Sequence, residues 1–284
     1  MKQSYSIILP AYNEAAAIGA VLVDLQQEFS KEEIIVVDDC STDGTAAVAA
    51  RYPVTLLRNV QNFGYGYSLK RGIKSAVHEH VIILDADGSY PVAALAPLVA
   101  EYEKGFDMVV GTRQGSFYHG PLLKRMARAC FRALSEFATG RTIPDINSGC
   151  RIFRKDLALR FFHTLSTGFS FTTTITLAFL LNAYAVRYLP IEYHKRTGNS
   201  KVRYLRDTLR SAQIITEAII FYNPLKMFLL CAAIIFCAGI ASFFIGFYSP
   251  PLAFLFFFTI AASVATLALG FIAVFLKFTH DAHS

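Results

Sequence analysis

Short apolar runs alternate with longer amphipathic stretches over the first 112 residues of the chain. The apolar runs predict β-strands at 5–10, 34–38, 54–57, 81–84 and 108–111, and helices are expected near 15–29, 45–51, 67–78 and 92–104. Strands this apolar are typical of a sheet that is covered on both faces, and the alternation of strand and helix indicates parallel pairing. The sequence therefore predicts an α/β domain with helices flanking a mainly parallel sheet.

Between about 115 and 222 the pattern becomes helical and basic. Its cations Lys124, Arg125, Arg128 and Arg132 are spaced along one amphipathic stretch. Such a helix could lie in a membrane interface with its cations toward the headgroups. A solvated charged face on an ordinary helix fits the same spacing equally well.

The last part of the chain is apolar, because residues 227–276 contain no Asp, Glu, Lys or Arg. The turn signal Tyr248-Ser249-Pro250-Pro251 divides it into the runs 227–247 and 252–276. At roughly 1.5 Å per residue, each run can cross a hydrocarbon core of about 30 Å. Since neither run has a polar face, we expect two transmembrane helices and not the buried hairpin of a soluble core.

Basic residues flank this segment at both ends, whereas the turn between the two runs has no charge. Lys277 follows the second run, and the cations before the first are Lys195, Arg196, Lys201, Arg203, Arg206, Arg210 and Lys226. Because positive residues stay on the cytoplasmic side, both termini and the large domain are expected in the cytosol. The chain is thus predicted to be an integral protein of the cytoplasmic (inner) membrane. No signal peptide is expected, since residues 1–4 run straight into a strand.

The net charge of +6 is moderate and clusters near the apolar segment. Anionic lipid headgroups are therefore the simplest partner, and no nucleic-acid partner is expected. The five cysteines are widely spaced and form no CxxC pair. They fit packing roles in a reduced cytosol and not disulfides or zinc.

Polar side chains follow four of the predicted strands. These strand ends read Pro10-Ala11-Tyr12-Asn13-Glu14, Asp38-Asp39, Asp85-Ala86-Asp87-Gly88 and Gly111-Thr112-Arg113. Ligands of parallel sheets bind beyond the carboxyl ends of the strands, so the four loops together predict a binding site. Carboxylates at i and i+2, such as Asp85 and Asp87, can share Mg²⁺ or Mn²⁺ with the oxygens of a diphosphate. The ion then offsets the charge on a departing nucleoside diphosphate.

These motifs carry a family resemblance. The ordered motifs are residues 10–14, Val37-Asp38-Asp39-Cys40-Ser41-Thr42-Asp43-Gly44-Thr45, Asn62-Phe63-Gly64-Tyr65-Gly66 and residues 85–88. Over roughly the first 115 residues the chain resembles family-two glycosyltransferases with the GT-A fold. Two later segments, 147–154 and 195–201, resemble the polyprenyl-phosphate branch, which includes dolichol-phosphate mannose synthase and bacterial undecaprenyl-phosphate glucosyl- and aminoarabinosyl-transferases.

The resemblance implies roles for the matching residues. Residues expected to contact the nucleotide-diphosphate sugar are Pro10, Ala11, Tyr12, Glu14, Asp39, Lys70, Asp85 and Ala86. Asp85 and Asp87 are expected to hold Mg²⁺ or Mn²⁺. Residues expected at the phosphate of a polyprenyl phosphate are Arg113, Lys124, Arg125, Arg128, Ser148 and Arg196. Within these sets the predicted catalytic residues are Asp87, Arg113 and Arg196.

A phosphate acceptor also removes the need for a general base. A sugar hydroxyl normally needs a base, whereas a phosphomonoester, with a second pKa of about 6, is already a dianion at neutral pH. Cationic positioning can then support in-line displacement with inversion at the anomeric carbon. Asp145, near Ser148, fits a base and a turn residue equally well.

The chain departs from the family pattern in two places. Some relatives carry Gln two residues after the second metal-site acid, where this chain has Ser89. Relatives often have an acidic residue after an aromatic-rich turn, where this chain reads Phe169-Ser170-Phe171-Thr172-Thr173-Thr174. What those side chains contribute is therefore absent here or supplied elsewhere.

The leading hypothesis is a membrane enzyme that transfers a hexose from a UDP-glucose-type or GDP-mannose-type donor to a polyprenyl phosphate. Its expected parts are a cytosolic GT-A catalytic domain at 1–200, juxtamembrane amphipathic helices at 201–226 and two transmembrane helices at 227–278. A processive polysaccharide synthase is one alternative, although those relatives carry a Gln-x-x-Arg-Trp motif and this chain has no Trp. A non-catalytic scaffold is the other, against which Asp85 and Asp87 argue. Relatives with a two-helix hairpin suggest a homo-oligomer, a tetramer.

Overall fold

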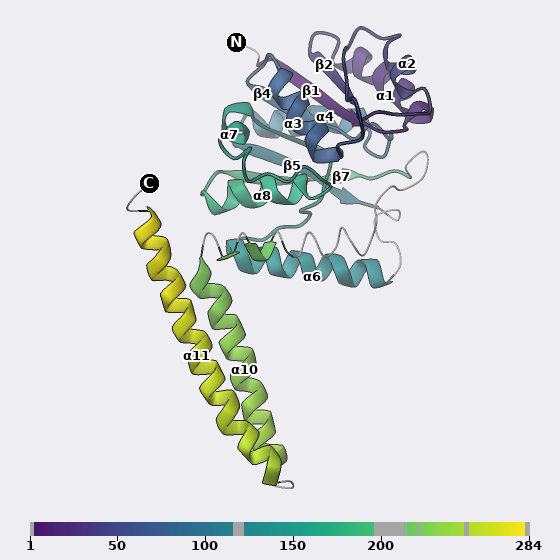
Figure 1. Cartoon of the computed structure of the whole chain (residues 1–284). Coiled ribbons are helices and arrows are strands. Elements are labelled where there is room, and N and C mark those ends of the chain that lie inside the picture. The colour runs from purple at the N-terminus through teal and green to yellow at the C-terminus, as the bar shows by residue number, and fades with distance from the viewer. Residues whose placement is uncertain are drawn as a thin grey trace. The chain divides into compact units, whose positions relative to one another are not determined.

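The computed structural model describes residues 3–115, 122–195, 213, 215–217, 219–220, 223–246 and 250–281. The chain divides into two compact units, Met1–Ala212 and Gln213–Ser284. Figure 1 shows the elements of both units, which are described separately below.

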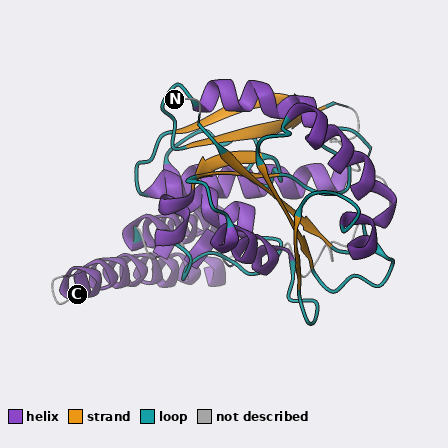
Figure 2. Cartoon of the chain, turned by 90° about the horizontal axis from the view of Figure 1, so that it is seen from above, coloured by secondary structure: helices purple, strands orange, loops and turns teal. Residues whose placement is uncertain are grey.

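The first unit is built on one seven-stranded sheet with the order β3-β2-β1-β4-β6-β5-β7. Its strands are β1 (Tyr5–Ala11), β2 (Glu33–Asp38), β3 (Thr55–Arg58), β4 (His80–Ile83), β5 (Met108–Gln114), β6 (Arg151–Arg154) and β7 (Val186–Glu192). Every pair is parallel except those of β6, which runs antiparallel to β4 and β5. Figure 2 shows the sheet from above, with its strands rotated relative to one another. The predicted mainly parallel α/β sheet is confirmed.

Helices cover both faces of the sheet (Figure 1). Along β1, Ile7 and Leu9 belong to one apolar core and Ile8 belongs to the other. The helices of the first unit are α1 (Ala15–Glu28), α2 (Thr45–Ala49), α3 (Tyr65–Ser75), the 3-10 turn η1 (Val92–Ala94), α4 (Leu95–Tyr102), α6 (Leu122–Thr139), α7 (Lys155–Arg160) and α8 (Phe171–Leu181). Residues of α1, η1 and α4 close the first core, and residues of α3, α7 and α8 close the second. Burial on both sides explains why all seven residues of β1 are buried.

Strands β6 and β7 correct the expectation that residues 115–222 are helical throughout. β6 has only four residues and inserts between β4 and β5, so its short run shows no period-two pattern. β7 lies at the edge of the sheet, and only Ile191 of its residues is buried. An edge position also tolerates Pro190, which has no N–H to donate. Both strands were missed because neither has a continuous apolar face.

The start of α3 lies two residues before the predicted one, at Tyr65. Gly64 precedes it with φ +100°, a left-handed conformation that favours glycine. A Cβ at Gly66 would lie closer than 3.0 Å to the carbonyl oxygens of Ser166 and Gly168. These glycines therefore let the first turn of α3 lie against the loop 166–168.

The predicted amphipathic stretch forms α6, which packs against α8. Ser135 and Ala138 on α6 are buried, whereas Arg125 and Arg132 are exposed. The helix thus turns its small residues to the core and keeps these cations outside. Whether that basic face meets lipid or water stays a prediction.

The second unit is a helical hairpin of α10 (Pro224–Gly246) and α11 (Pro250–Asp281). The two helices approach closely, since a Cβ at Gly239 would lie closer than 3.0 Å to Thr259 Oγ1. The Ser263 hydroxyl also donates to the Ala232 carbonyl at 2.9 Å. By length and composition, Pro224–Phe244 and Leu255–Leu276 could each cross a membrane. The predicted spans 227–247 and 252–276 fall on these helices, and the turn residues 247–249 lie outside the described residues.

Candidate active site

The strand ends that carry the predicted donor residues lie side by side at one edge of the sheet, because β1 pairs with both β2 and β4. Pro10 and Ala11 end β1, and the backbone N–H of Asp39 donates to the Ala11 carbonyl at 2.8 Å. Tyr12 follows directly, and the Glu14 N–H donates to Thr45 Oγ1 at 2.8 Å. The structure therefore brings these five predicted residues together. Their contact with a nucleotide stays a prediction.

Asp39 is buried and uses its carboxylate to hold the next loop. Its Oδ1 accepts from Asn59 Nδ2 at 2.6 Å and from the Phe63 N–H at 3.0 Å, and its Oδ2 accepts from the Gly64 N–H at 2.8 Å. Three donors from one loop orient this carboxylate firmly. Asp39 thus has a structural role in holding this loop, and its expected contact with the donor stays a prediction.

Lys70 of α3 points its ammonium at a loop and not at a carboxylate. It donates to the carbonyl of Phe162 at 2.8 Å and also to the carbonyl of Leu165. Burial, followed by the charge of Lys74, lowers the pKa of Lys70. Its expected contact with the donor stays a prediction.

Asp85 follows β4 and is held from two sides. The Tyr65 hydroxyl donates to Asp85 Oδ1 at 2.8 Å. Burial, and then the charge of Asp85, raise the pKa of Tyr65, so this hydroxyl remains a donor. On the other side a Cβ at Gly149 would lie closer than 3.0 Å to both carboxylate oxygens of Asp85. The carboxylate therefore rests directly on the backbone at Gly149.

Asp87 is 7% exposed and lies in the turn that follows Ala86. Its Oδ1 accepts from the N–H and the hydroxyl of Ser89, at 2.9 Å and 2.5 Å. Ser89, the departure from the family Gln, thus orients this acid through a hydrogen bond. The Ser89 carbonyl in turn accepts from the His194 N–H at 2.9 Å. The end of β7 is therefore fastened to the Asp87 turn.

The residues present fit a divalent cation. Asp85 and Asp87 supply hard oxygen ligands from one turn, which suits Mg²⁺ or Mn²⁺ better than softer metals. Within the described residues there is no cluster of three or more His, Cys, Asp and Glu that could hold a metal alone. A pair of acids leaves positions for diphosphate oxygens and water, as such a site requires.

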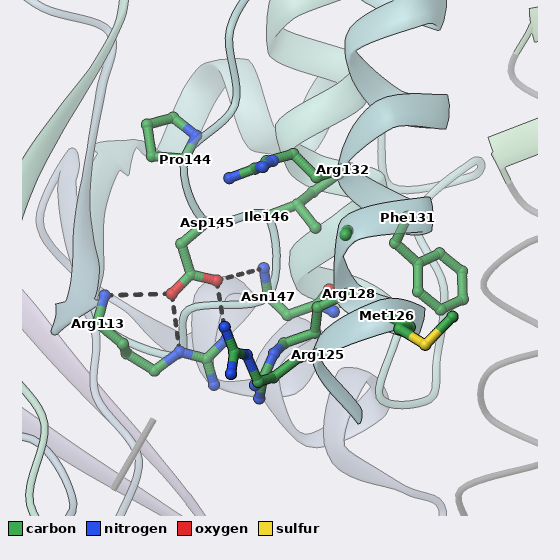
Figure 3. A pocket seen from close by; sticks show the side chains of 11 residues that line it. Arg113, Arg125, Met126, Arg128, Phe131, Arg132, Pro144, Asp145, Ile146 and Asn147 are labelled. Carbon is green, nitrogen blue, oxygen red and sulfur yellow. Dashed lines mark hydrogen bonds and ion pairs between the residues drawn. The ribbon is translucent and has the colours of Figure 1, made fainter. Parts of the chain in front are cut away.

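A basic cavity of about 450 Å³ lies between α6, the end of β5 and the loop before β6. We call it the arginine cavity; its arginines are Arg113, Arg125, Arg128 and Arg132, and Met126, Phe131 and Ile146 add apolar surface. Among the described residues that line it, Asp145 is the one carboxylate beside four arginines, so this lining is strongly positive. Figure 3 shows Arg113 of β5 beside Asp145, with Arg125, Arg128 and Arg132 of α6 lining the same cavity.

Asp145 is buried and forms a two-pronged ion pair with Arg113 (Figure 3). Arg113 Nε donates to Oδ2 and Nη2 donates to Oδ1, each at 2.8 Å. Burial alone would raise the pKa of Asp145, but the charge and hydrogen bonds of Arg113 outweigh it and hold this pKa below its usual value. Such an acid is a poor proton acceptor at neutral pH. Asp145 Oδ1 also accepts from the Asn147 N–H at 3.2 Å, a contact typical of a turn residue, and the part of Asp145 in the reaction stays a prediction.

The six predicted acceptor residues are distributed unevenly. Arg113, Arg125 and Arg128 line the arginine cavity. Ser148 is buried beside it, where its hydroxyl bonds with Tyr90 and Cys150. The Lys124 side chain and the whole of Arg196 lie outside the described residues. Their expected contact with a phosphate stays a prediction.

Asp85 and Asp87 do not line the arginine cavity, but a short chain of contacts joins the two places. The Tyr90 hydroxyl accepts from the Gly149 N–H at 2.8 Å, beside the Asp85 carboxylate. The Tyr90 ring packs on Tyr193 with centroids 5.2 Å apart, and the Arg113 guanidinium lies 5.6 Å from the Tyr193 centroid. The Asp85 carboxylate and the Arg113 guanidinium are therefore linked through Gly149 and the ring pair Tyr90–Tyr193.

Sequence reasoning missed several of these residues. Tyr65 and Gly149 lie against Asp85, and both fall within quoted motifs. Tyr193 lies against Arg113, and Tyr90 joins Gly149 to Tyr193; neither falls within a quoted motif. A tyrosine in an apolar context gives no sequence signal, because its role depends on which carboxylate its hydroxyl reaches. At the second family departure, the Thr173 hydroxyl donates to Asn147 Oδ1 at 2.7 Å. A threonine thus supports the cavity wall there.

Comparisons with known proteins find other glycosyltransferases. The dolichyl-phosphate hexose transferase of Haloferax volcanii is 28% identical over 199 residues, covering 69% of this chain and 86% of that protein. The glycosyltransferase AglJ of the same organism is 28% identical over 216 residues, covering 74% of this chain and 68% of that protein.

Solved structures show the same fold. The glucosyl-3-phosphoglycerate synthase of Mycobacterium tuberculosis in complex with UDP has a TM-score of 0.62 at 18% identity, covering 76% of this chain and 80% of that one. The same enzyme with Mn²⁺, UDP and glucosyl-3-phosphoglycerate has a TM-score of 0.58 at 21% identity, covering 75% of this chain and 78% of that one. The predicted GT-A arrangement is thus confirmed. Residues 6–162, more than half of the chain, match the family described as Glycosyl transferase family 2. The chain therefore belongs to that family.

Proposed function

We propose that this glycosyltransferase moves a hexose from a nucleotide-diphosphate sugar to a polyprenyl phosphate, with inversion, at the cytosolic face of the membrane. The arginine cavity is the observation that carries the proposal. Among its described lining residues are four arginines, one carboxylate and apolar side chains. The ring pair Tyr90–Tyr193 lies between this cavity and the backbone beside Asp85. A phosphate joined to an apolar chain has the same combination of groups. The dolichyl-phosphate hexose transferase at 28% identity is consistent with that acceptor class.

The arginines supply binding and orientation. Guanidinium groups pair bidentately with phosphate oxygens and keep their proton at any physiological pH. Asp145 fixes the plane of Arg113 and leaves the cavity with a large excess of positive charge. A phosphate dianion held there needs no base, so the low pKa of Asp145 does not hinder the reaction.

The displacement balances without a proton transfer. An oxygen of the lipid phosphate attacks the anomeric carbon as the bond from that carbon to the diphosphate oxygen breaks. The electron pair leaves with the nucleoside diphosphate, and the configuration at the anomeric carbon inverts. Asp85 and Asp87 would hold Mg²⁺ or Mn²⁺, which when bound neutralises charge on the departing diphosphate. The Mn²⁺ and UDP of the Mycobacterium tuberculosis enzyme are consistent with this donor class.

The helical hairpin is proposed to anchor the enzyme in the cytoplasmic membrane. Phe257 and Phe258 on α11 are 70% and 71% exposed. Exposure of these aromatic side chains to water would be unfavourable, whereas exposure to lipid would not. The basic residues before α10 and the Lys277 that follows the second apolar run would keep both ends cytosolic. A tetramer and the domain bounds 1–200, 201–226 and 227–278 stay predictions.

A transfer assay tests the proposal. Wild-type protein would receive radiolabelled UDP-glucose or GDP-mannose, Mg²⁺ or Mn²⁺, and a short-chain polyprenyl phosphate; the matched control acceptor is the polyprenol without phosphate. We expect a labelled lipid carrying one hexose, formed only with the phosphate and with equimolar release of nucleoside diphosphate.

Other outcomes would contradict the proposal in recognisable ways. A labelled polymer that stays out of the organic phase would indicate a processive synthase. Transfer to the polyprenol alone would remove the arginine cavity from the acceptor site. No product with a full panel of nucleotide sugars would favour a scaffold that retains the fold.

A further inference from the structure

The segment 145–151 connects the arginine cavity with the acids at the end of β4. It begins with Asp145 and Asn147 in the cavity wall, passes Gly149 against Asp85, and ends with Arg151 in β6. One short stretch of backbone therefore touches both halves of the site.

Arg151 ties this segment down from inside the protein. Its side chain is fully buried, and its Nη1 donates to the Thr172 carbonyl at 3.1 Å and to Thr176 Oγ1 at 2.8 Å. Its Nε and Nη2 donate to the Ser148 carbonyl. A planar guanidinium that donates in several directions leaves the backbone it holds little freedom.

Two further contacts fix the same segment. Asn147 accepts from the Thr173 hydroxyl at 2.7 Å, and the Gly149 N–H donates to the Tyr90 hydroxyl at 2.8 Å. Ser148 is thus held by Arg151 of β6 and Gly149 by Tyr90, while α8 holds the neighbouring Asn147. The backbone at Gly149 cannot shift without breaking buried hydrogen bonds.

The Asp85 carboxylate, in contrast, is the end of a side chain. A Cβ at Gly149 would lie closer than 3.0 Å to the carboxyl carbon and both oxygens of Asp85. These three atoms are the nearest that such a Cβ would meet, so the clash falls first on the Asp85 carboxylate. With the backbone fixed, the carboxylate has to move away and lose its place beside the Tyr65 hydroxyl.

We infer that Gly149 is a positioning residue: with Tyr65 it clamps the Asp85 carboxylate in the orientation that binds the divalent cation of the donor complex. The absence of a side chain at 149 is what lets the acid rest on a backbone held by Arg151 and Tyr90. The inference rests on the proposed metal role of Asp85 but not on the identity of the acceptor.

The test is a double-mutant cycle read by metal binding, without any acceptor. Mn²⁺ would be titrated, with free Mn²⁺ followed by electron paramagnetic resonance, in the presence of UDP or GDP. Gly149→Ala is expected to weaken Mn²⁺ binding by about tenfold or more, the size that supporting residues of metal sites show. In an Asp85→Asn background the same substitution should have no further effect, because it acts through Asp85. Gly168→Ala is the matched control, since its Cβ would meet nothing nearer than Ser166 Oγ at 3.8 Å.

A second variant covers the case in which Gly149→Ala does not fold. Tyr65→Phe removes the other half of the clamp with little change in shape, and it should also weaken Mn²⁺ binding and be silent beside Asp85→Asn. Wild-type affinity in both folded single variants, additive effects in the cycle, or no Mn²⁺ and no Mg²⁺ binding by the wild type would each overturn the inference. A wild type that transfers nothing to lipid but still shows the cycle would refute the proposed acceptor and leave the clamp intact.

Discussion

Single residues in this site act through oriented carboxylates. Asp39 is held by three donors from one loop, and Asp145 is held by Arg113 through both oxygens. Asp87 is held through one oxygen by Ser89, and Asp85 lies between Tyr65 and Gly149. An acid with a fixed orientation binds a cation or a ligand hydroxyl without first losing conformational freedom. Each carboxylate has different hydrogen-bond partners, and these partners set its orientation.

Asp87→Ala tests the metal role directly. Transfer is expected to fall by several orders of magnitude while the fold survives, because the side chain lies in a turn and not in the core of the sheet. Initial rates with saturating donor and acceptor measure the loss, with the exposed Asp24→Ala as control. Activity within tenfold of wild type, about 1.4 kcal/mol in barrier height, would exclude the role.

The Asp145–Arg113 pair predicts an acid-sensitive contribution to stability. Because the pKa of Asp145 is held below its unfolded value of about 3.9, its contribution is present above that pH and is lost as pH falls through the folded pKa. Thermal midpoints measured between pH 6 and pH 3 should fall less steeply for Asp145→Asn than for wild type. Parallel curves would show that the pair adds nothing to stability in this range.

Elements of secondary structure bring these residues together in ways that chain order hides. β6 enters the sheet antiparallel between β4 and β5, so the loop before it reaches both the acid after β4 and the arginine on β5. α6 then closes the arginine cavity from outside, with Arg125 and Arg128 one turn apart. The arginine cavity, which we propose as the acceptor site, is thus made by α6, the end of β5 and the loop before β6. The loops predicted to bind the donor follow β1, β2 and β4.

Arg125→Ala tests the part that α6 plays. Loss of one charge-assisted contact is expected to raise KM for polyprenyl phosphate by about tenfold, while KM for the donor stays the same. Steady-state kinetics with each substrate varied in turn measure the split. The exposed Arg51→Ala serves as the control for removal of a cation. A larger effect on the donor than on the acceptor would place Arg125 at the wrong substrate.

The whole molecule joins a catalytic α/β unit to a hairpin whose surface is apolar. α10 and α11 contact each other through Gly239 and through the Ser263–Ala232 hydrogen bond. Their outward phenylalanines include Phe257, Phe258 and Phe275, all exposed. This apolar surface fits the membrane anchor that we propose for the hairpin, because an anchored enzyme and a lipid acceptor would share one membrane.

A labelling experiment tests the topology. Ser249→Cys places a thiol in the turn between the two predicted spans, which should face away from the cytosol. A membrane-impermeant maleimide should label this variant in intact cells and leave wild type unlabelled, although the exposed Cys130 on α6 should react after lysis. Labelling of wild type in intact cells would reverse the predicted orientation.

The sequence by itself determined much of the fold and the location of the acids. Strongly apolar strands, polar strand ends and ordered motifs are local features, so β1, β2, β4 and β5, Asp85, Asp87 and the arginines of α6 could be found from the chain alone. The two apolar helices could also be predicted from the sequence, because a long run without charged residues is visible in the composition alone.

Only the tertiary structure decided what joins these parts. That β6 lies inside the sheet, that Gly149 supports Asp85, that Tyr90 and Tyr193 separate the acids from Arg113, and that Asp145 is an ion-pair partner all depend on residues far apart in the chain. Periodicity and propensity report which face of an element is buried. They do not report which side chains of other elements that face contacts. In this protein such long-range contacts orient the charged groups of the site.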